Sequence, residues 1–460
     1  MKKKIQAAAV LLALLVSASA CQEAKVPTET METTEITETA ETTETTESTE
    51  TTESTVGVEQ KEEQESQPSS HTLTVEQMKE DLDTLCDTLE KNHKNLYANV
   101  TKEDFEAARR AVEGRLDTLS PAQFYFELTT LVAMVGDAHT HMDLTGYDKY
   151  EYLTGLPFAI GKLSDGWYLL MADKEREEWL GSRILAINGV DIEELRERAK
   201  TIISHENETW VDQCLSNAIN FKEALEWLDA PGEEEGAVLT LEKYNETQSQ
   251  EILFPYYPGQ SIFEAEIISF PMYEFPTAPS GIYRADALSD EAYYIQYNQC
   301  MEAPDLPMKD FAAAVEEQLE SGDYKKVLVD LRYNSGGNST VIKPLVNSLL
   351  KMKKEKDFQI YTLIGEGTFS SGILNALELK HSLGSVLVGG PTGGNVNCYG
   401  EIKQFELPNM AAMVNYSTKY FQPYPNYEKD SLYPDMEAEQ SMEDVLAGVD
   451  RPVEMILNLQ

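Results

Sequence analysis

The stretch "FQIYTLIGEGTFSSGILNALELKHSLGSVLVG", residues 358–389, decides the fold class. It begins with an apolar run at 358–364, passes through a glycine-rich loop into an apolar helical pattern at 371–383, and ends with a second apolar run at 385–389. Strands that are apolar throughout and are separated by a helix are typical of a parallel sheet covered on both faces. The stretch therefore predicts a strand–helix–strand unit of an α/β fold.

The same alternation continues toward the N-terminus. Apolar runs at 292–298 and 326–332 read as strands, and helical periodicity follows each of them, at 308–320 and 340–352. We therefore expect an α/β domain over residues 259–460.

Three loops leave the carboxyl ends of the predicted strands. They are "YNSGGN" (333–338), "GEGTFSSG" (365–372) and "GPTGGN" (390–395), all rich in glycine and small polar residues. Open α/β sheets bind ligands at this edge. We expect the catalytic or binding residues of the protein to lie at this edge.

Ser370 stands where the second of these loops enters a helix. Its hydroxyl could act as a nucleophile, and backbone N–H groups of Ser371, Gly336 and Gly337 could then hold an oxyanion. Serine is also among the commonest helix N-caps, and such a loop can cradle a phosphate. These residues alone leave the three interpretations open.

Residues 1–20 are typical of a secretory signal, with three lysines, an apolar stretch and small residues before Cys21. A cysteine in this place resembles a bacterial lipoprotein box, although Ala18 stands where leucine is usual. We expect Cys21 to be the lipidated N-terminus of an extracellular, membrane-anchored protein, since two acyl chains give stable anchoring. The alternative is simple secretion.

Residues 21–70 consist largely of threonine, glutamate and serine, and 22–70 contain fourteen acidic and two basic residues. Such a segment cannot bury enough apolar surface to fold, so a disordered stalk is predicted. The whole chain has a net charge of −43, which makes nucleic acid an improbable partner.

Beyond Cys21 the cysteines are far apart and show no metal-ligand spacing. They are Cys86, Cys214, Cys300 and Cys398. The sequence neither requires nor excludes disulfides, and it predicts no metal and no cofactor. It gives no signal for an oligomeric state.

Residues 71–149 are predicted to be helical, and residues 150–258 to form a β-rich insert. The clearest part of the insert is "GSRILAINGVDIEEL" (181–195), a strand, an Asn-Gly turn and a helix. This piece resembles part of a PDZ domain, which pairs with an extended peptide. A purely structural hairpin explains it equally well.

Three segments together resemble the tail-specific, or C-terminal processing, serine peptidases. They are "VLVDLRYNSGG" (327–337), "GTFSSGILNAL" (367–377) and "SVLVGGPTGGN" (385–395). The resemblance implies a crotonase/ClpP-like parallel-sheet domain with Ser370 as nucleophile. In one branch of the family a lysine of the third segment is the base, but here Asn395 occupies that position, and a neutral amide cannot accept the proton of serine.

A second branch, which includes the tricorn core protease and the interphotoreceptor retinoid-binding protein, uses a histidine and a late glutamate. The resemblance places His139 of "GDAHTHMD" (136–143) on the histidine and Glu428 of "NYEKDSLYPD" (426–435) on the glutamate. His141 is the competing base, and Ala138 replaces the serine usual before the histidine. A histidine base predicts a rate that rises with pH near 6 to 7.

The sequence thus predicts a cell-surface serine-type endopeptidase that hydrolyses peptide or protein substrates through an acyl-enzyme on Ser370. A helical part would supply His139, and the PDZ-like insert would hold the C-terminal end of the substrate. The alternative is a catalytically inactive peptide- or ligand-binding lipoprotein on the same fold, because the retinoid-binding relative shows that the fold can carry ligands.

Overall fold

The computed structural model describes residues 72–143, 152–270 and 275–460. The predicted signal peptide, Cys21 and the predicted stalk lie outside the described residues. Among the residues that are described, no helix is both long and apolar enough to cross a bilayer. Cys86, Cys214, Cys300 and Cys398 are free thiols.

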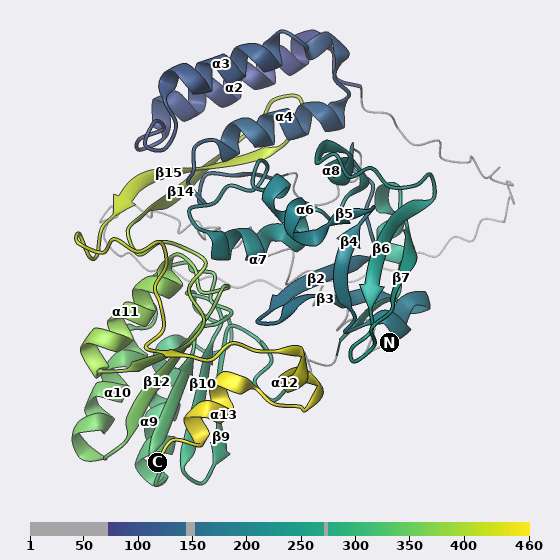
Figure 1. The fold of residues 1–460 in the computed structure, drawn as a ribbon. Helices are drawn as coiled ribbons and strands as arrows, with labels where there is room; N and C mark the ends of the chain where they lie inside the picture. Colours follow the sequence, from purple (N-terminus) through teal and green to yellow (C-terminus); the bar gives the residue numbers. More distant parts are fainter. Residues whose placement is uncertain (1–71, 144–151, 271–274) are drawn as a thin grey trace, which may run out of the picture. The chain divides into compact units, whose positions relative to one another are not determined.

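A six-stranded sheet forms the C-terminal α/β part, in the order β16-β13-β12-β11-β10-β9 (Figure 1). The strands are β9 (Tyr283–Ser289), β10 (Ala292–Tyr297), β11 (Lys326–Asp330), β12 (Gln359–Ile364), β13 (Val386–Gly389) and β16 (Met436–Glu437). All neighbours pair in parallel except β9, which runs antiparallel to β10. The parallel sheet predicted from the alternating pattern is confirmed.

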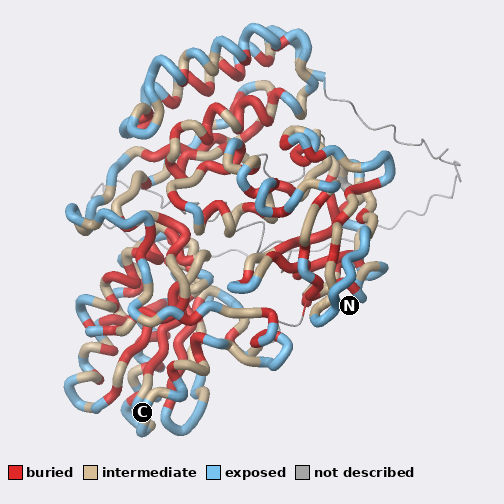
Figure 2. Tube along the Cα trace, viewed as in Figure 1, coloured by how far each residue is buried: buried red, intermediate tan, exposed pale blue. Residues whose placement is uncertain are grey.

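Helices cover both faces of this sheet. One hydrophobic cluster joins the strands to α9 (Met308–Ser321), α10 (Lys343–Glu355) and α11 (Ser371–Leu383), and a second joins the other face to α13 (Arg451–Leu457). The inner strands β10, β11, β12 and β13 are largely buried, whereas the helices expose their outer faces (Figure 2). Helix α10 begins three residues later than predicted because Pro344 is tolerated only in the first turn of a helix.

A second sheet has the order β2-β3-β4-β6-β7, with β5 paired to β4 and β8 paired to β3. The strands are β2 (Phe158–Leu163), β3 (Gly166–Asp173), β4 (Arg183–Ile187), β5 (Val190–Asp191), β6 (Gly236–Glu242), β7 (Ser249–Pro255) and β8 (Ile267–Ser269). Asn188 and Gly189 join β4 to β5 with φ values of 50° and 77°, as the predicted tight turn requires. Because β8 lies past residue 258, this sheet extends beyond the boundary predicted for the β-rich insert.

The N-terminal part consists of α2 (Val75–Asn92), α3 (Lys102–Glu113) and α4 (Pro121–Ala133), as the periodicity of 73–135 predicts. A third sheet links it to the C-terminal part. In that sheet β15 (Met413–Phe421) pairs with both β1 (Met142–Asp143) and β14 (Cys398–Glu406). The chain therefore returns from the α/β part to lie beside the segment that contains His139.

Three further helices belong to the β-rich insert and one to the C-terminal part. They are α6 (Ile192–Ala199), α7 (Glu208–Ala218), α8 (Lys222–Trp227) and α12 (Met442–Leu446). Short 3-10 turns are η1 (Leu116–Thr118), η2 (Lys174–Trp179) and η3 (Gly259–Glu264). The crotonase-like and PDZ-like descriptions stay predictions at this level of detail.

Candidate active site

Ser370 lies in a strained turn between β12 and α11. Its backbone has φ 51° and ψ −123°, and its side chain makes no hydrogen bond to the helix that it precedes. A non-glycine residue held in so sparsely populated a region costs about 1–3 kcal/mol, and such residues cluster at active sites. Ser370 stands at the N-cap position but does not cap the helix, which removes one of the alternative interpretations.

Gly336, in the loop after β11, packs directly against Ser370. A Cβ atom added at Gly336 would lie 2.7 Å from the Cβ of Ser370 and 3.1 Å from the backbone nitrogen of Ser371. No side chain fits in that space, and the positive φ of 109° also favours glycine. The loop after β11 and the turn after β12 therefore meet through their backbones.

The three expected oxyanion donors differ in their hydrogen bonds. The Gly336 N–H already donates to Asn334 Oδ1 at 3.0 Å, so it is engaged. The N–H groups of Ser371 and Gly337 have no acceptor among the described residues. Ser371 Oγ donates to the carbonyl of Gly337 at 2.6 Å and so ties the two loops together. Ser371 and Gly337 are the pair left free to hold an oxyanion.

His139 lies beside this turn through a stack of rings. Its imidazole stacks on Phe369, the residue before Ser370, with centroids 4.5 Å apart. Phe369 also stacks on Trp210 of α7, at 4.0 Å. His139 is only 2 % exposed, and neither ring nitrogen has a hydrogen-bond partner among the described residues. Burial lowers the pKa of His139 to about 4, which keeps the imidazole neutral.

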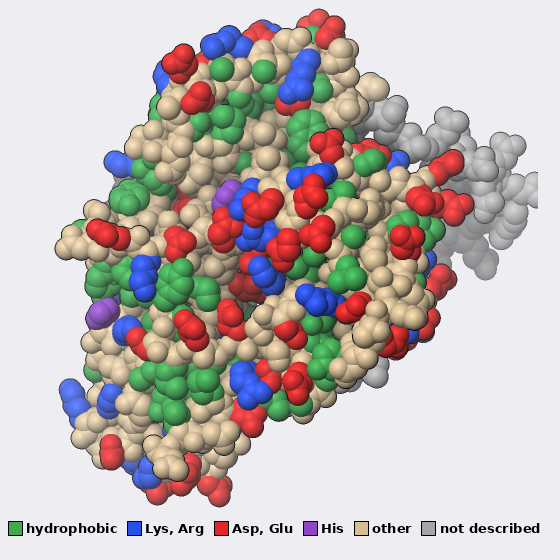
Figure 3. Space-filling model, in the orientation of Figure 1, with side chains coloured by type: hydrophobic (Ala, Val, Ile, Leu, Met, Phe, Trp, Pro, Cys, Tyr) green, Lys and Arg blue, Asp and Glu red, His purple; other side chains and the backbone are tan. Residues whose placement is uncertain are grey.

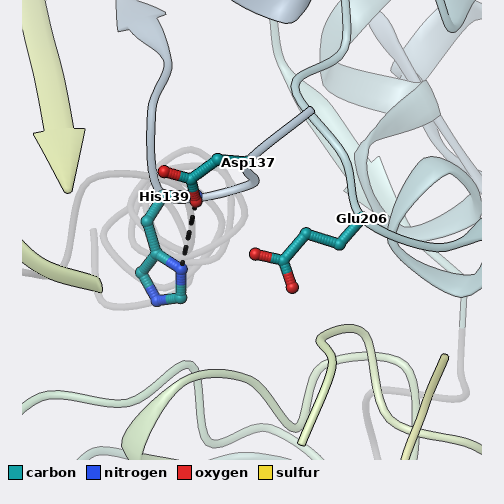
Figure 4. Close-up of side chains that lie close together, drawn as sticks. All are labelled: Asp137, His139 and Glu206. Carbon is teal, nitrogen blue, oxygen red and sulfur yellow. Dashed lines mark hydrogen bonds and ion pairs between the residues drawn. The ribbon is translucent and has the colours of Figure 1, made fainter. Parts of the chain in front are cut away.

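Asp137 is the ionised group next to His139 (Figure 4). Its Oδ1 accepts the His139 backbone N–H at 3.0 Å and lies 3.9 Å from the ring Nδ1. Its Oδ2 accepts from Thr140 Oγ1 at 2.6 Å and from His93 Nε2 at 3.1 Å. The His93 Nδ1 accepts the Asn95 N–H, so Nε2 carries the proton. Burial alone would raise the pKa of Asp137, but the hydrogen bond from His93 and the nearby His139 lower it to about 2.

Glu206 completes a cluster with Asp137 and His139. One donor atom from each of the three residues lies within 4.8 Å of the others, and the carboxyl group of Glu206 faces the imidazole in Figure 4. Its Oε2 accepts the backbone N–H of Asn395 at 3.3 Å, whereas its Oε1 has no partner among the described residues. Burial, followed by the charge of Asp137, raises the pKa of Glu206 well above its usual range.

The segment that carries Glu206 is held by a network of charges. The buried Arg196 of α6 pairs with Asp212 and Glu208 of α7, and Lys200 pairs with Glu208 as well. Figure 3 shows basic and acidic side chains side by side over the region of α6 and α7. Asn207 caps α7 through the Trp210 N–H and donates to the carbonyl of Asp430. The network fixes the entry of α7, and with it Glu206 and Trp210.

Glu428, which the family resemblance places on the acidic position, lies in the segment between β15 and β16. It is exposed, and it forms no hydrogen bond or ion pair with His139 among the described residues. The loop around it is instead anchored by Asn397, which donates to the carbonyl of Tyr424 at 2.6 Å. The acids beside His139 are Asp137 and Glu206. Asp137 lies within the quoted "GDAHTHMD", but no feature of "SHENETW" (204–210) singles out Glu206 in the sequence.

The other two candidates for the base have different surroundings. His141 Nε2 lies 3.3 Å from Asp143 and 3.0 Å from the Asn415 amide nitrogen and is engaged, whereas His141 Nδ1 is buried without a partner among the described residues. Asn395 has an amide side chain whose oxygen is buried without a partner. His139 is the candidate whose two ring nitrogens are both unpaired and whose ring stacks on Phe369, next to Ser370.

A cavity of about 840 Å³ lies next to this site. It is lined by β2, by α7 and by the loops that follow the parallel strands, including Ser335 and Glu366. Ser370 and His139 are not among its lining residues, but Trp210 is, and Trp210 stacks on Phe369. Burial and the charge of Asp212 raise the pKa of Glu366 to about 7.

Comparison with known proteins identifies the fold. No family model and no curated protein matches the chain. The solved structure of mature CPAF in complex with lactacystin aligns with a TM-score of 0.58 at 13% identity, covering 81% of this chain and 96% of that one. This chain has the fold of CPAF. A second structure of mature CPAF aligns with a TM-score of 0.57 at 12% identity, covering 81% and 95% of the two chains.

The tricorn protease aligns with a TM-score of only 0.39, at 13% identity, over 83% of this chain and 36% of that chain. A similarity this low does not distinguish one branch of the peptidases from another. The resemblance to the branch with a histidine and a glutamate therefore stays a prediction from the sequence.

Proposed function

We propose that the chain is a serine-type endopeptidase that cleaves peptide bonds through an acyl-enzyme on Ser370. The observation that carries the proposal is the backbone of Ser370, which is held at positive φ with its hydroxyl unengaged by the helix. In a protein that needed only a helix cap, this strain would have no compensating benefit. The mixed α/β fold shared with CPAF supports the proposal at the level of fold.

In the proposed reaction Ser370 Oγ attacks the carbonyl carbon of the peptide while His139 accepts its proton. The N–H groups of Ser371 and Gly337 donate to the oxyanion that forms. His139 then donates the proton to the leaving amine, and a water molecule hydrolyses the acyl-enzyme in the same way. Neutral histidine is the form that can accept a proton, and burial keeps His139 neutral.

In this proposal Asp137 takes the role that the family resemblance assigns to Glu428. Its carboxylate is ionised and lies 3.9 Å from His139 Nδ1, so it stabilises the imidazolium that forms when His139 takes the serine proton. His93 and Thr140 hold Asp137 in place. We therefore propose Ser370, His139 and Asp137 as the working set.

The cavity next to the site is the proposed entry for the substrate. Strand β2 lies at the edge of its sheet, and both β2 and α7 line the cavity. An extended peptide could pair with such an edge, as peptides do with PDZ domains. We propose that the β-rich insert holds the C-terminal end of the substrate there.

We also propose that the protein is anchored at the cell surface through a lipid on Cys21. The proposal rests on the signal-like residues 1–20 and on the position of the cysteine. Expression of Cys21→Ala followed by fractionation tests it, because the variant should leave the membrane fraction. A Cys21→Ala protein that remains with the membrane would overturn the anchor.

The rival function is a binding protein on the same fold. It is favoured by one observation: no hydrogen bond joins Ser370 to His139 among the described residues. A labelled fluorophosphonate separates the two, because only a base-activated serine reacts quickly with it. The endopeptidase predicts rapid labelling of the wild type and none of Ser370→Ala. Equal, slow labelling of both would favour the binding protein.

A further inference from the structure

In the cluster of Asp137, His139 and Glu206, some atoms that could coordinate a metal have no hydrogen-bond partner. Both nitrogens of His139 and the Oε1 of Glu206 are buried without a partner among the described residues. Leaving a buried polar atom unpaired costs about 1–3 kcal/mol, and such atoms are rare in folded proteins. The two nitrogens of one imidazole point away from each other, so one of them can share an occupant with Glu206 Oε1, and this unpaired pair indicates a bound group.

The atoms are close enough to share one ion. A ring nitrogen of His139 and one carboxylate oxygen each from Asp137 and Glu206 lie within 4.8 Å of one another. Figure 4 shows both carboxyl groups facing the imidazole. To bind a metal at about 2.0–2.2 Å, the three ligand atoms would have to move toward one another only by a small adjustment of their side chains.

The surrounding residues already orient two of the three ligands. His93 and Thr140 both donate to Asp137 Oδ2, whereas Oδ1 accepts the His139 backbone N–H and lies toward the ring of His139. The Asn395 N–H donates to Glu206 Oε2 and leaves Oε1 unused. Hydrogen bonds of this kind, made to the oxygen that does not bind the metal, are what hold carboxylate ligands in known metal sites.

We propose that Asp137, His139 and Glu206 bind one divalent transition-metal ion of the zinc type. One imidazole nitrogen and two carboxylate oxygens, with a fourth position left for water, form a ligand set that suits Zn²⁺. Mg²⁺ and Ca²⁺ require six or more oxygen ligands, which the cluster does not supply. No sequence pattern indicates this site, because its ligands lie up to 69 residues apart and follow no metal-ligand spacing.

Metal binding would switch the proposed peptidase off. A neutral imidazole has one proton and one lone pair. When the lone pair of Nδ1 is given to the metal, the proton stays on Nε2, and the ring can no longer accept the proton of Ser370. This consequence rests on the proposed function, whereas the binding itself does not.

The binding is tested by titrating Zn²⁺ into the full-length chain, previously dialysed against EDTA, in competition with a chromophoric chelator. We expect one tight equivalent for the wild type and at least about tenfold weaker binding for Glu206→Gln, since even the loss of an outer-shell partner costs about 10–100-fold in affinity. His139→Ala should weaken binding likewise. His381→Ala is the matched control, because His381 is exposed and stacks on Tyr424 instead.

Tight binding of one Zn²⁺ that survives both Glu206→Gln and His139→Ala would overturn the proposal. The absence of any tightly bound Zn²⁺ in the wild type would also overturn it and would leave water as the occupant of the cluster. If His139→Ala does not fold, the nearly isosteric Glu206→Gln decides alone, with the unfolding transition of each variant showing whether it is folded.

A second measurement tests the switch. Zn²⁺ should inhibit peptide hydrolysis in parallel with occupancy, EDTA should restore the rate, and Mg²⁺ should have no effect. Full activity at saturating Zn²⁺ would overturn the inhibitory part. If no peptide is hydrolysed under any condition, the proposed function fails while the binding titration still decides whether the metal site exists.

Discussion

The turn that contains Ser370 and the cluster of Asp137, His139 and Glu206 are held in place in different ways. The turn is held by neighbouring backbone: Gly336 fits against Ser370, and the Phe369 N–H donates to the carbonyl of Asn334 at 2.9 Å. The cluster is assembled from the side chains of Asp137, His139 and Glu206, with His93 bound to Asp137. The geometry of the turn therefore depends on backbone contacts with the loop after β11, while the protonation state of His139 depends on the burial of its side chain.

The largest expected effect concerns the turn. Ser370→Ala removes the only proposed nucleophile, so peptide hydrolysis should fall by about six orders of magnitude, to background. Steady-state kinetics on a soluble peptide measures it, with an unchanged unfolding transition as the control. Wild-type turnover in Ser370→Ala would mean that the activity comes from a contaminant and would favour the binding protein.

The next effect concerns the cluster. His139→Ala removes the proposed base and should lower kcat by about two to four orders of magnitude. His141→Ala is the control and should cost much less, because His141 Nε2 is engaged by Asp143 and Asn415, whereas the ring of His139 stacks on the residue before Ser370. If the two variants exchange these outcomes, His141 is the base.

The two acids are compared by Asp137→Asn and Glu428→Gln. The neutral amide at position 137 cannot stabilise the imidazolium, so kcat should fall by about 100-fold. Glu428→Gln should change kcat by less than about twofold, because this side chain is exposed. A large loss in Glu428→Gln with little in Asp137→Asn would restore the assignment made from sequence.

The pH dependence follows from the burial of His139. Its pKa is lowered to about 4 in the folded protein, against 6.5 for an ordinary histidine. The value of kcat/KM should therefore rise with pH through an ionisation near 4, rather than near 6 to 7 as the sequence alone suggests. A rate profile centred at 6.5 would show that His139 is solvated or that another group is the base.

The same shift affects stability. Because the pKa of His139 is lower in the folded protein, the unfolded chain binds more protons between the two pKa values. The contribution of His139 to the free energy of unfolding is therefore fully present above pH 6.5 and is lost as the pH falls toward 4. This contribution is about 3 kcal/mol at most. Urea unfolding between pH 4 and 7 should show the acid-side loss in the wild type and a smaller loss in His139→Ala. An equal loss of stability in the wild type and His139→Ala would contradict this assignment to His139.

The smallest effect tests the strain in the turn. Glycine accepts the positive φ of residue 370, whereas alanine does not, so Ser370→Gly should be more stable to unfolding than Ser370→Ala by about 1 kcal/mol. Both variants lack the hydroxyl, so the difference isolates the backbone. Equal stabilities would show that the turn is not strained.

Much of the fold could be predicted from the sequence because its signals are local. The apolar runs predicted β10, β11, β12 and β13, and the Asn188-Gly189 turn was recognised from two residues. The third sheet was not predicted, since β1 and β15 are far apart in sequence and β1 has only two residues.

The residues of the site also differ in whether a local sequence signal pointed to them. Ser370 was a candidate from its own loop and was assigned as nucleophile by family resemblance, and the structure adds its strained backbone. Glu428 was chosen by family resemblance and proved to be exposed. Glu206 was missed because its proximity to His139 depends on how α7 packs, which Arg196 and Asn207 decide through contacts with distant residues.

By itself the sequence determined the alternation of strands and helices, the parallel sheet and the position of the serine at its edge, because periodicity and turn residues act over a few neighbours. Only the tertiary structure decided that His139 is buried and neutral, and which acids face it. Burial and electrostatic interaction depend on distance in space, and residues 93, 137 and 206 become neighbours only when the chain has folded.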